Sequence, residues 1–94
     1  MTAVGLLTVD LQIPGSRSLK SKRKVVKSIV ARLRQRFNVA VAEVDYLDKW
    51  QRCLIGVSAV SNDARHVDSQ LRKALDSIEG MGLAVILDFE IEIL

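Results

Sequence analysis

The order of the hydrophobic periods along this chain is the feature that most limits its fold. Four segments have the two-residue period or the short apolar run of a β-strand, and two longer segments have the three- and four-residue steps of an amphipathic helix. The predicted strands cover residues 5–12, 39–46, 51–60 and 83–94, and the predicted helices cover residues 19–37 and 64–78. This βαββαβ order predicts a ferredoxin-like α+β fold, in which right-handed crossovers place both helices on one face of a four-stranded antiparallel sheet.

The alternation also predicts which side chains face the core. The first strand is expected to bury Leu7, Val9 and Leu11, and the third to bury Cys53, Ile55, Val57 and Ala59. The last strand is expected to bury Val85, Leu87, Phe89, Ile91 and Ile93 and to expose Asp88, Glu90 and Glu92. The facing of residues 39–46 stays open, because Val39 and Val41 compete with Ala42 and Val44 for the inner face.

Turn and cap residues separate these elements. Pro14 and Gly15 end the first strand, after which Ser16 or Ser18 supplies a helix N-cap. Residues 39–60 are expected to form a hairpin around a polar turn. Ser61-Asn62-Asp63 caps the second helix, and Gly80 and Gly82 close it.

Length and composition exclude several protein classes. Ninety-four residues suffice for one domain, so residues 1–94 are expected to form a single unit. With one cysteine, Cys53, and one histidine, His66, the chain can build neither an internal disulfide nor a cysteine/histidine zinc site, and no metal or cofactor is predicted. The N-terminus lacks a signal sequence, and no apolar run approaches the roughly 20 residues of a membrane span. We therefore expect a cytoplasmic protein without membrane contact.

Charge is distributed very unevenly along the chain. Nine of the 14 basic residues lie between Arg17 and Arg36, where there is no acidic residue. The rest of the chain holds five basic and eleven acidic residues, a net charge of −6. The molecule is therefore dipolar, with one strongly cationic segment.

The cationic segment is predicted to form a basic ridge on the first helix. At about 100° per residue, Lys20, Lys24, Lys27 and Arg34 fall within roughly an 80° sector, with Arg23 at its border. Like charges four residues apart destabilise a helix, and a polyanion would relieve their repulsion. The alternative is a solvated face that balances the acidic remainder. The predicted nucleic-acid contacts are Arg17, Ser18, Lys20, Lys22, Arg23, Lys24, Lys27 and Arg34.

Other features bear on where RNA would bind. The loop of residues 13–18 offers amides and hydroxyls to a phosphate, although ordinary N-capping is the more common explanation of such a loop. Trp50 could stack on a base, but such a residue more often folds over the edge of the core. The outer strands carry no aromatic residue on their open face, where the expected side chains are Thr8, Asp10, Gln12, Asp88, Glu90 and Glu92. We therefore expect RNA on the helical side.

No catalytic constellation is found. His66 is expected at the surface of the second helix without a nucleophile or carboxylate partner, and Cys53 is expected in the core. Ser21 to Lys24 fits a bare S-x-x-K pattern but lacks the other motifs of serine acyl-enzymes. The chain is therefore predicted not to be an enzyme.

Several motifs together resemble the YlxP-like family of small bacterial proteins. They are SLKSKR at residues 18–23, RLRQRFNVAVAEV at 32–44, DKWQ at 48–51 and the Asn62-Asp63 pair, and the resemblance covers essentially the whole chain. It implies a ferredoxin-like fold and, indirectly, a ribosome-associated role, since genes of this family often lie among those for translation initiation and ribosome maturation factors. It implies no catalytic residue. The residues at the matched positions are suspected RNA contacts, namely Ser18, Lys20, Lys22, Arg23, Arg34 and Asn38.

The leading hypothesis is a non-enzymatic protein that binds RNA or a ribosomal subunit through the first helix. Two alternatives belong to other classes. One is a small-molecule sensor, because residues 10–19 faintly resemble the strand-loop-helix segment of ACT domains. The other is an assembly module, such as a homodimer in which the acidic sheet of one copy faces the basic helix of another.

Overall fold

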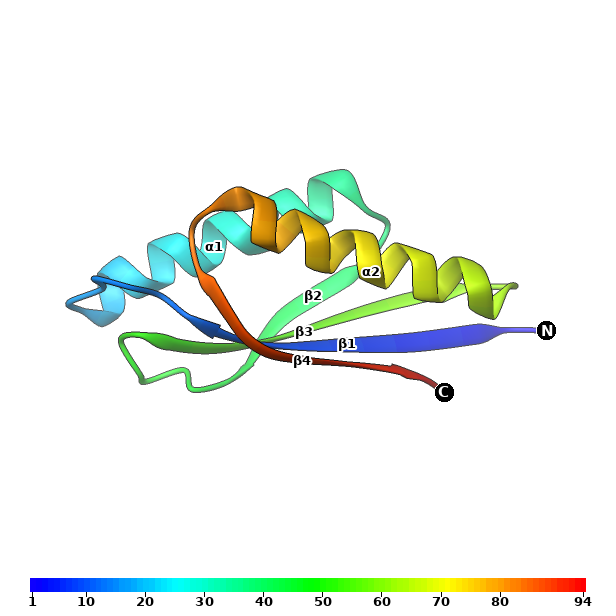
Figure 1. Ribbon diagram of the computed structural model, residues 1–94, viewed down its shortest axis with the longest axis horizontal. Helices are drawn as coiled ribbons and strands as arrows, with labels where there is room; N and C mark the ends of the chain where they lie inside the picture. Colours follow the sequence, from blue (N-terminus) through cyan, green and yellow to red (C-terminus); the bar gives the residue numbers. More distant parts are fainter.

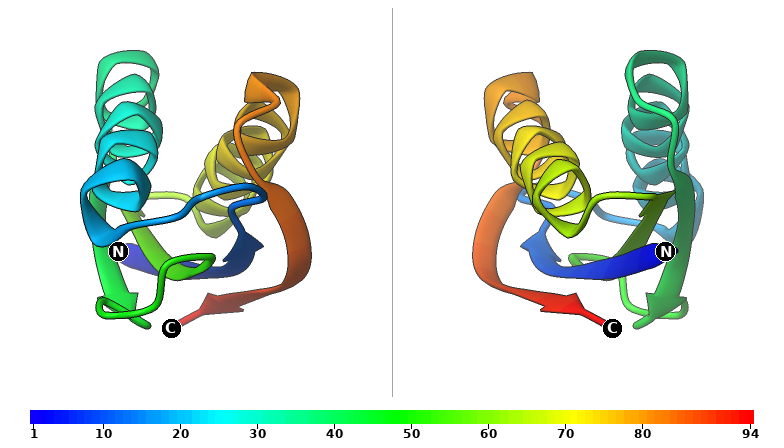
Figure 2. Two further views of the ribbon diagram at one scale, coloured as in Figure 1. Left: turned by 90° about the vertical axis from the view of Figure 1, so that its left-hand side faces the viewer. Right: turned by 90° about the vertical axis from the view of Figure 1, so that its right-hand side faces the viewer.

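The computed structural model describes all residues from 1 to 94 and confirms the predicted order of elements. They are β1 (Ala3–Gln12), α1 (Leu19–Arg36), β2 (Ala40–Asp45), β3 (Arg52–Ser61), α2 (Ala64–Met81) and β4 (Val85–Ile93). The strands form one antiparallel sheet in the order β2-β3-β1-β4, so β1, which was expected to be an outer strand, lies inside the sheet. Both helices lie on the same face of this sheet (Figures 1 and 2). The ferredoxin-like α+β fold is therefore confirmed.

The core lies between the sheet and the two helices, as the alternation predicts. All the inward residues predicted for β1 and β3 are buried. The helices contribute Ile29 and Leu33 from α1 and Val67, Leu71 and Ile78 from α2. Gly5 lets α2 approach β1, because a Cβ at this position would lie 2.5 Å from Cγ1 of Val67.

The structure settles the facing of β2, which the sequence left open. Val41 pairs with Val57 and Glu43 pairs with Ile55, so both residues point towards the helices. Ala42 and Val44 lie on the open face of the sheet. The inner face of β2 therefore presents one apolar and one acidic side chain to α1.

The predicted burial of β4 is wrong for four of the five residues that were expected to face the core. Val85, Leu87, Phe89 and Ile93 are each between 40% and 48% exposed. A register shift opposite Asp10 and Leu11 makes Ile86, rather than Leu87, the partner of Leu11. Beyond this bulge Phe89 and Ile93 do face the helical side, but β4 is an edge strand and α2 packs mainly on β1 and β3.

The caps explain where the helices begin and end. Oγ of Ser18 accepts a hydrogen bond from the amide of Ser21 at 3.0 Å, and a carboxylate oxygen of Asp63 accepts one from the amide of Arg65 at 2.9 Å. Gly82 ends α2 in the left-handed conformation, with φ of 67°. Neither helix is long and apolar enough to cross a membrane.

Candidate nucleic-acid interface

The predicted basic ridge is present on the solvent side of α1. Its members, here called the α1 ridge, are Lys20, Arg23, Lys24, Lys27 and Arg34, and all are exposed. Four of them line a shallow depression of about 560 Å³ that has no apolar lining residue. Arg34 is held against the neighbouring strand, because its Nη2 donates to the carbonyl of Val41 at 2.9 Å. Arg17 is also exposed, just ahead of the helix.

The cations of the α1 ridge have no acidic partners within the protein. The four ion pairs of the structure are Lys22 with Glu43, Arg52 with Asp10, Arg65 with Asp63 and Arg72 with Asp68. The first turn of α1 contains no acidic residue. A cation in the first turn of a helix, such as Lys20, opposes the helix dipole, whereas Arg34 in the last turn favours it. The ridge is therefore free to meet an external polyanion.

The prediction that Lys22 contacts nucleic acid is wrong, because its side chain is 0% exposed. Its Nζ lies 2.6 Å from Oε2 of Glu43 and donates a hydrogen bond to the carbonyl of Tyr46 at 2.7 Å. A signal for this burial exists in the sequence. Lys22 precedes Val26 by four residues and Ile29 by seven, which places it on the apolar stripe of the helix.

Glu43 links this lysine to the only cysteine. Its Oε2 makes no hydrogen bond of good geometry, so the ammonium of Lys22 is what offsets the burial of the carboxylate. Burial, followed by the nearby charge of Glu43, raises the pKa of Cys53 to about 12. Cys53 is fully buried, as predicted, and its thiol stays protonated at neutral pH.

The loop ahead of α1 is held by its own hydrogen bonds. Ser18 serves as the N-cap, while Ser16 is buried and its Oγ donates to the carbonyl of Ser18 at 3.3 Å. Nε2 of Gln51 donates to the carbonyl of Ser16 at 3.1 Å, and the amide of Ile13 donates to the carbonyl of Gln51 at 2.9 Å. The loop therefore has the ordinary capping role that was the alternative to phosphate binding, and it is tied to the β2-β3 hairpin.

Trp50 does not fold over the edge of the core, although the sequence favoured that position for it. It is 55% exposed and lies in the hairpin loop, next to the Gln51 that bonds to the β1-α1 loop. The hairpin loop and the start of α1 lie at the same end of the molecule, on the left in Figure 1. An exposed indole is thus available near the start of the α1 ridge.

The open face of the sheet is less acidic than expected. Arg52 donates from Nη2 to both carboxylate oxygens of Asp10, at 2.9 and 2.8 Å, and this contact raises the pKa of Arg52. The acidic residues of this face without an ion pair are Asp45 of β2 and the three of β4, namely Asp88, Glu90 and Glu92. The sequence reasoning overlooked the apolar part of this face, where Val4, Leu6, Val44 and Val60 are exposed.

Two further basic residues were not among the predicted contacts. Arg32 and Arg36 lie on the side of α1 that faces α2 and line a groove between the helices. Both positions carry exposed side chains. Their place on the wheel, away from the α1 ridge, could have indicated a second basic surface. His66 is exposed, as expected, and no group of three His, Cys, Asp or Glu side chains could hold a metal ion.

Comparisons with known proteins concern the family and the fold. Residues 4–91 match the family described as "Protein of unknown function (DUF503)". The "Uncharacterized protein YlxP" of Bacillus subtilis (strain 168) is 36% identical over 76 residues, which span 81% of this chain and 83% of the relative. The de novo designed protein Foldit4 is 14% identical, covers 100% of this chain and 97% of its own, and has a TM-score of 0.58. This likeness to a designed protein concerns the fold alone.

Proposed function

We propose that this chain, which belongs to the DUF503 family as its YlxP-like motifs predict, is a non-enzymatic RNA-binding protein of the bacterial cytoplasm. It docks on structured RNA, such as that of a ribosomal subunit, through the α1 ridge. The observation that carries this proposal is a ridge of five exposed cations without a single ion pair to the protein's own eleven acidic residues.

Phosphate neutralisation supplies most of the affinity in this proposal. Lysine and arginine on an exposed helix face can reach the phosphates of a folded RNA, and the released counterions drive association. Such contacts position the protein without reading sequence, so the shape of the RNA sets most of the selectivity. Arg17 extends the contact surface at the start of α1.

Charge and aromatic placement orient the complex. The unpaired carboxylates of β4 lie on the open face of the sheet, so they repel phosphate from the side opposite the helices. Trp50 lies at the end of the molecule where α1 begins, and its exposed indole is suited to stack on an unpaired base.

One observation favours a second candidate, an assembly module. The open face of the sheet combines exposed apolar residues, Val4, Leu6 and Val44 among them, with the acidic residues of β4. Contact between this face and the α1 ridge of another copy would cover the sheet face of one copy and the ridge of its neighbour. The small-molecule alternative has less support, because the polar groups of Ser16 and Ser18 are used within the β1-α1 loop.

A charge reversal with a matched control tests the RNA proposal. The variant K20E/K24E/K27E and the control R65E/R72E/K73E each reverse three exposed cations, the first set on α1 and the second on α2. We expect the α1 variant to lose binding to a fluorescein-labelled RNA stem-loop, measured by fluorescence anisotropy, and the α2 control to keep most of it. Both should retain a cooperative thermal melt. Equal losses in the two variants would show that net charge, rather than the ridge, determines binding.

A further inference from the structure

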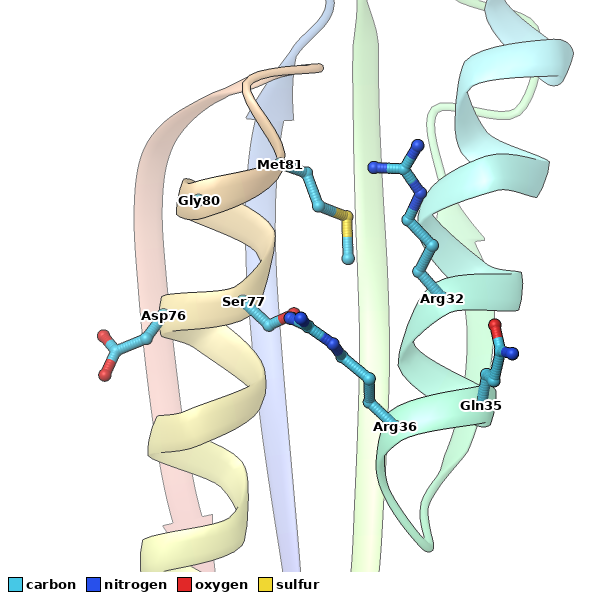
Figure 3. Close-up of a pocket in the computed structure, with 7 residues that line it drawn as sticks. All are labelled: Arg32, Gln35, Arg36, Asp76, Ser77, Gly80 and Met81. Carbon is cyan, nitrogen blue, oxygen red and sulfur yellow. The ribbon is translucent and has the colours of Figure 1, made fainter.

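The groove between the helices lies along the C-terminal halves of both. It has a volume of about 430 Å³ and is lined by Arg32 and Arg36 from α1 and by Ser77, Gly80 and Met81 from α2. Figure 2 shows the two helices splayed apart above the sheet, and Figure 3 shows the two arginines extending from α1 towards α2. The groove is therefore open to solvent and basic on one wall.

The two guanidinium groups have few partners in the protein. Each carries five N–H donors, and the only one bonded within the protein is Nη1 of Arg36, which donates to Oγ of Ser77 at 3.2 Å. Neither arginine belongs to an ion pair. Asp76 also borders the groove, but Figure 3 shows its carboxylate directed away from both arginines. The groove thus presents two positive charges without a neutralising carboxylate.

Helix stability explains only part of this arrangement. Arg36 lies in the last turn of α1, where a cation favours the helix dipole, but Arg32 lies four residues earlier and its like charge opposes that of Arg36. Gly80 sits within α2, where glycine is a poor helix former, and a Cβ there would meet no atom within 4 Å. An alanine or larger residue there would favour the helix, so Gly80 borders the groove at some cost to α2. Arg32 and Gly80 are therefore two residues beside this groove that do not favour the helices.

We infer that the interhelical groove is a second phosphate site, which holds a phosphodiester group of the RNA bound by the α1 ridge. The inference rests on the proposed function. A guanidinium fork matches the oxygens of a phosphate, and the Ser77 contact places Arg36 across the groove. Arg32 lies about 12 Å along the axis from Lys24 and about 80° around it, so an RNA backbone that crosses α1 passes from the ridge into the groove.

Paired arginine variants test this site. We expect R32A/R36A to weaken binding of the labelled RNA stem-loop about tenfold and to make the salt slope of log K shallower by about 1. The control R65A/R72A removes two exposed arginines of α2, each of which is paired with an acidic residue of its own helix or cap. It should leave both the affinity and the slope close to those of the native protein.

A neutral substitution separates a seated phosphate from a general effect of charge. Ser77→Leu fills the groove opposite Arg36 without changing charge, and we expect it to weaken RNA binding while a cooperative thermal melt is kept. If S77L and R32A/R36A bind like the control while reversal of the ridge still abolishes binding, the groove site is refuted and the proposed function stands. If the native protein does not bind the RNA, both are refuted. If both arginine pairs weaken binding equally and S77L does not, the effect is non-specific and the groove site is again refuted.

Discussion

Nζ of Lys22 lies 2.6 Å from Oε2 of Glu43, and this buried ion pair joins α1 to β2. The same ammonium group donates to the carbonyl of Tyr46, a residue held at φ of 61° where the hairpin turn begins. One lysine of the most basic segment is therefore a structural residue that fixes the helix over the sheet. The exposed lysines beside it on α1 are left for an external partner.

Removal of one member of this pair should destabilise the fold strongly. Lys22→Met leaves the Glu43 carboxylate buried without a counter-charge, and we expect a loss of about 3–5 kcal/mol in the free energy of unfolding. The double variant K22M/E43L should recover most of this loss, because it leaves no buried charge. Urea denaturation measures both. A single variant as stable as the native protein would show that the pair contributes nothing.

The same variant separates structure from binding. Because Lys22 is buried, K22M should bind RNA as the native protein does, under conditions where it remains folded. Anisotropy titration at low temperature measures this affinity. A loss as large as that of K20E/K24E/K27E would contradict the assignment of Lys22 to the interior.

The thiol of Cys53 should be inert in the folded protein and should make stability depend on alkaline pH. Its pKa is raised from 9.0 to about 12, so the folded state keeps a proton that the unfolded state loses. This contribution to stability is fully present below about pH 9 and is lost as the pH rises towards 12. Urea denaturation between pH 8 and 11 should show a smaller alkaline loss of stability for Cys53→Ala than for the native protein. The difference should correspond to the titration of roughly one ionisable group. If the free energy of unfolding depended on pH identically in the two proteins, the raised pKa of Cys53 would be contradicted.

Two glycines should respond to alanine in opposite directions. A Cβ at Gly5 would lie 2.5 Å from Val67 and 2.9 Å from Leu71, so Gly5→Ala should cost about 1–3 kcal/mol through overpacking. Gly80→Ala meets open space within α2 and should stabilise the protein by roughly 0.5–1 kcal/mol. Thermal melts of the two variants measure both changes in stability. A stabilised G5A would mean that α2 does not pack closely on β1.

The acidic residues of β4 should not take part in RNA binding. Replacing Asp88, Glu90 and Glu92 by serine should leave the affinity for RNA unchanged or raise it modestly, because long-range repulsion is removed. A sharp loss of binding would contradict this and favour the assembly module. Sedimentation of the same variant over a range of concentrations would then show whether the partner is a second copy.

The sequence predicts those parts of the fold in which one residue pattern has one structural solution. Leu7, Val9 and Leu11 alternate with polar residues, so the inner face of β1 follows from the chain itself. The exposure of Phe89 could not be predicted, because the burial of an edge strand depends on how far the neighbouring helix reaches. The helical period places Lys22 on the apolar stripe, but the partner that allows its burial is Glu43, a residue 21 positions away whose facing the pattern of β2 left open.

Part of the candidate site could likewise be predicted from the sequence, and part could not. The outer cations, such as Lys20 and Lys24, lie where the helical period places them. The groove at Arg32 and Arg36 requires the angle between two helices that are separate in the sequence, and no local pattern specifies that angle.

The salt dependence of association with RNA tests the central claim most directly. The measurement is co-sedimentation of the protein with ribosomal subunits, and with free ribosomal RNA, over a series of salt concentrations. If the basic side of α1 neutralises roughly four to six phosphates, log K should fall with log salt at a slope of about −3 to −5. A flat salt response, or no association at low salt, would contradict the account.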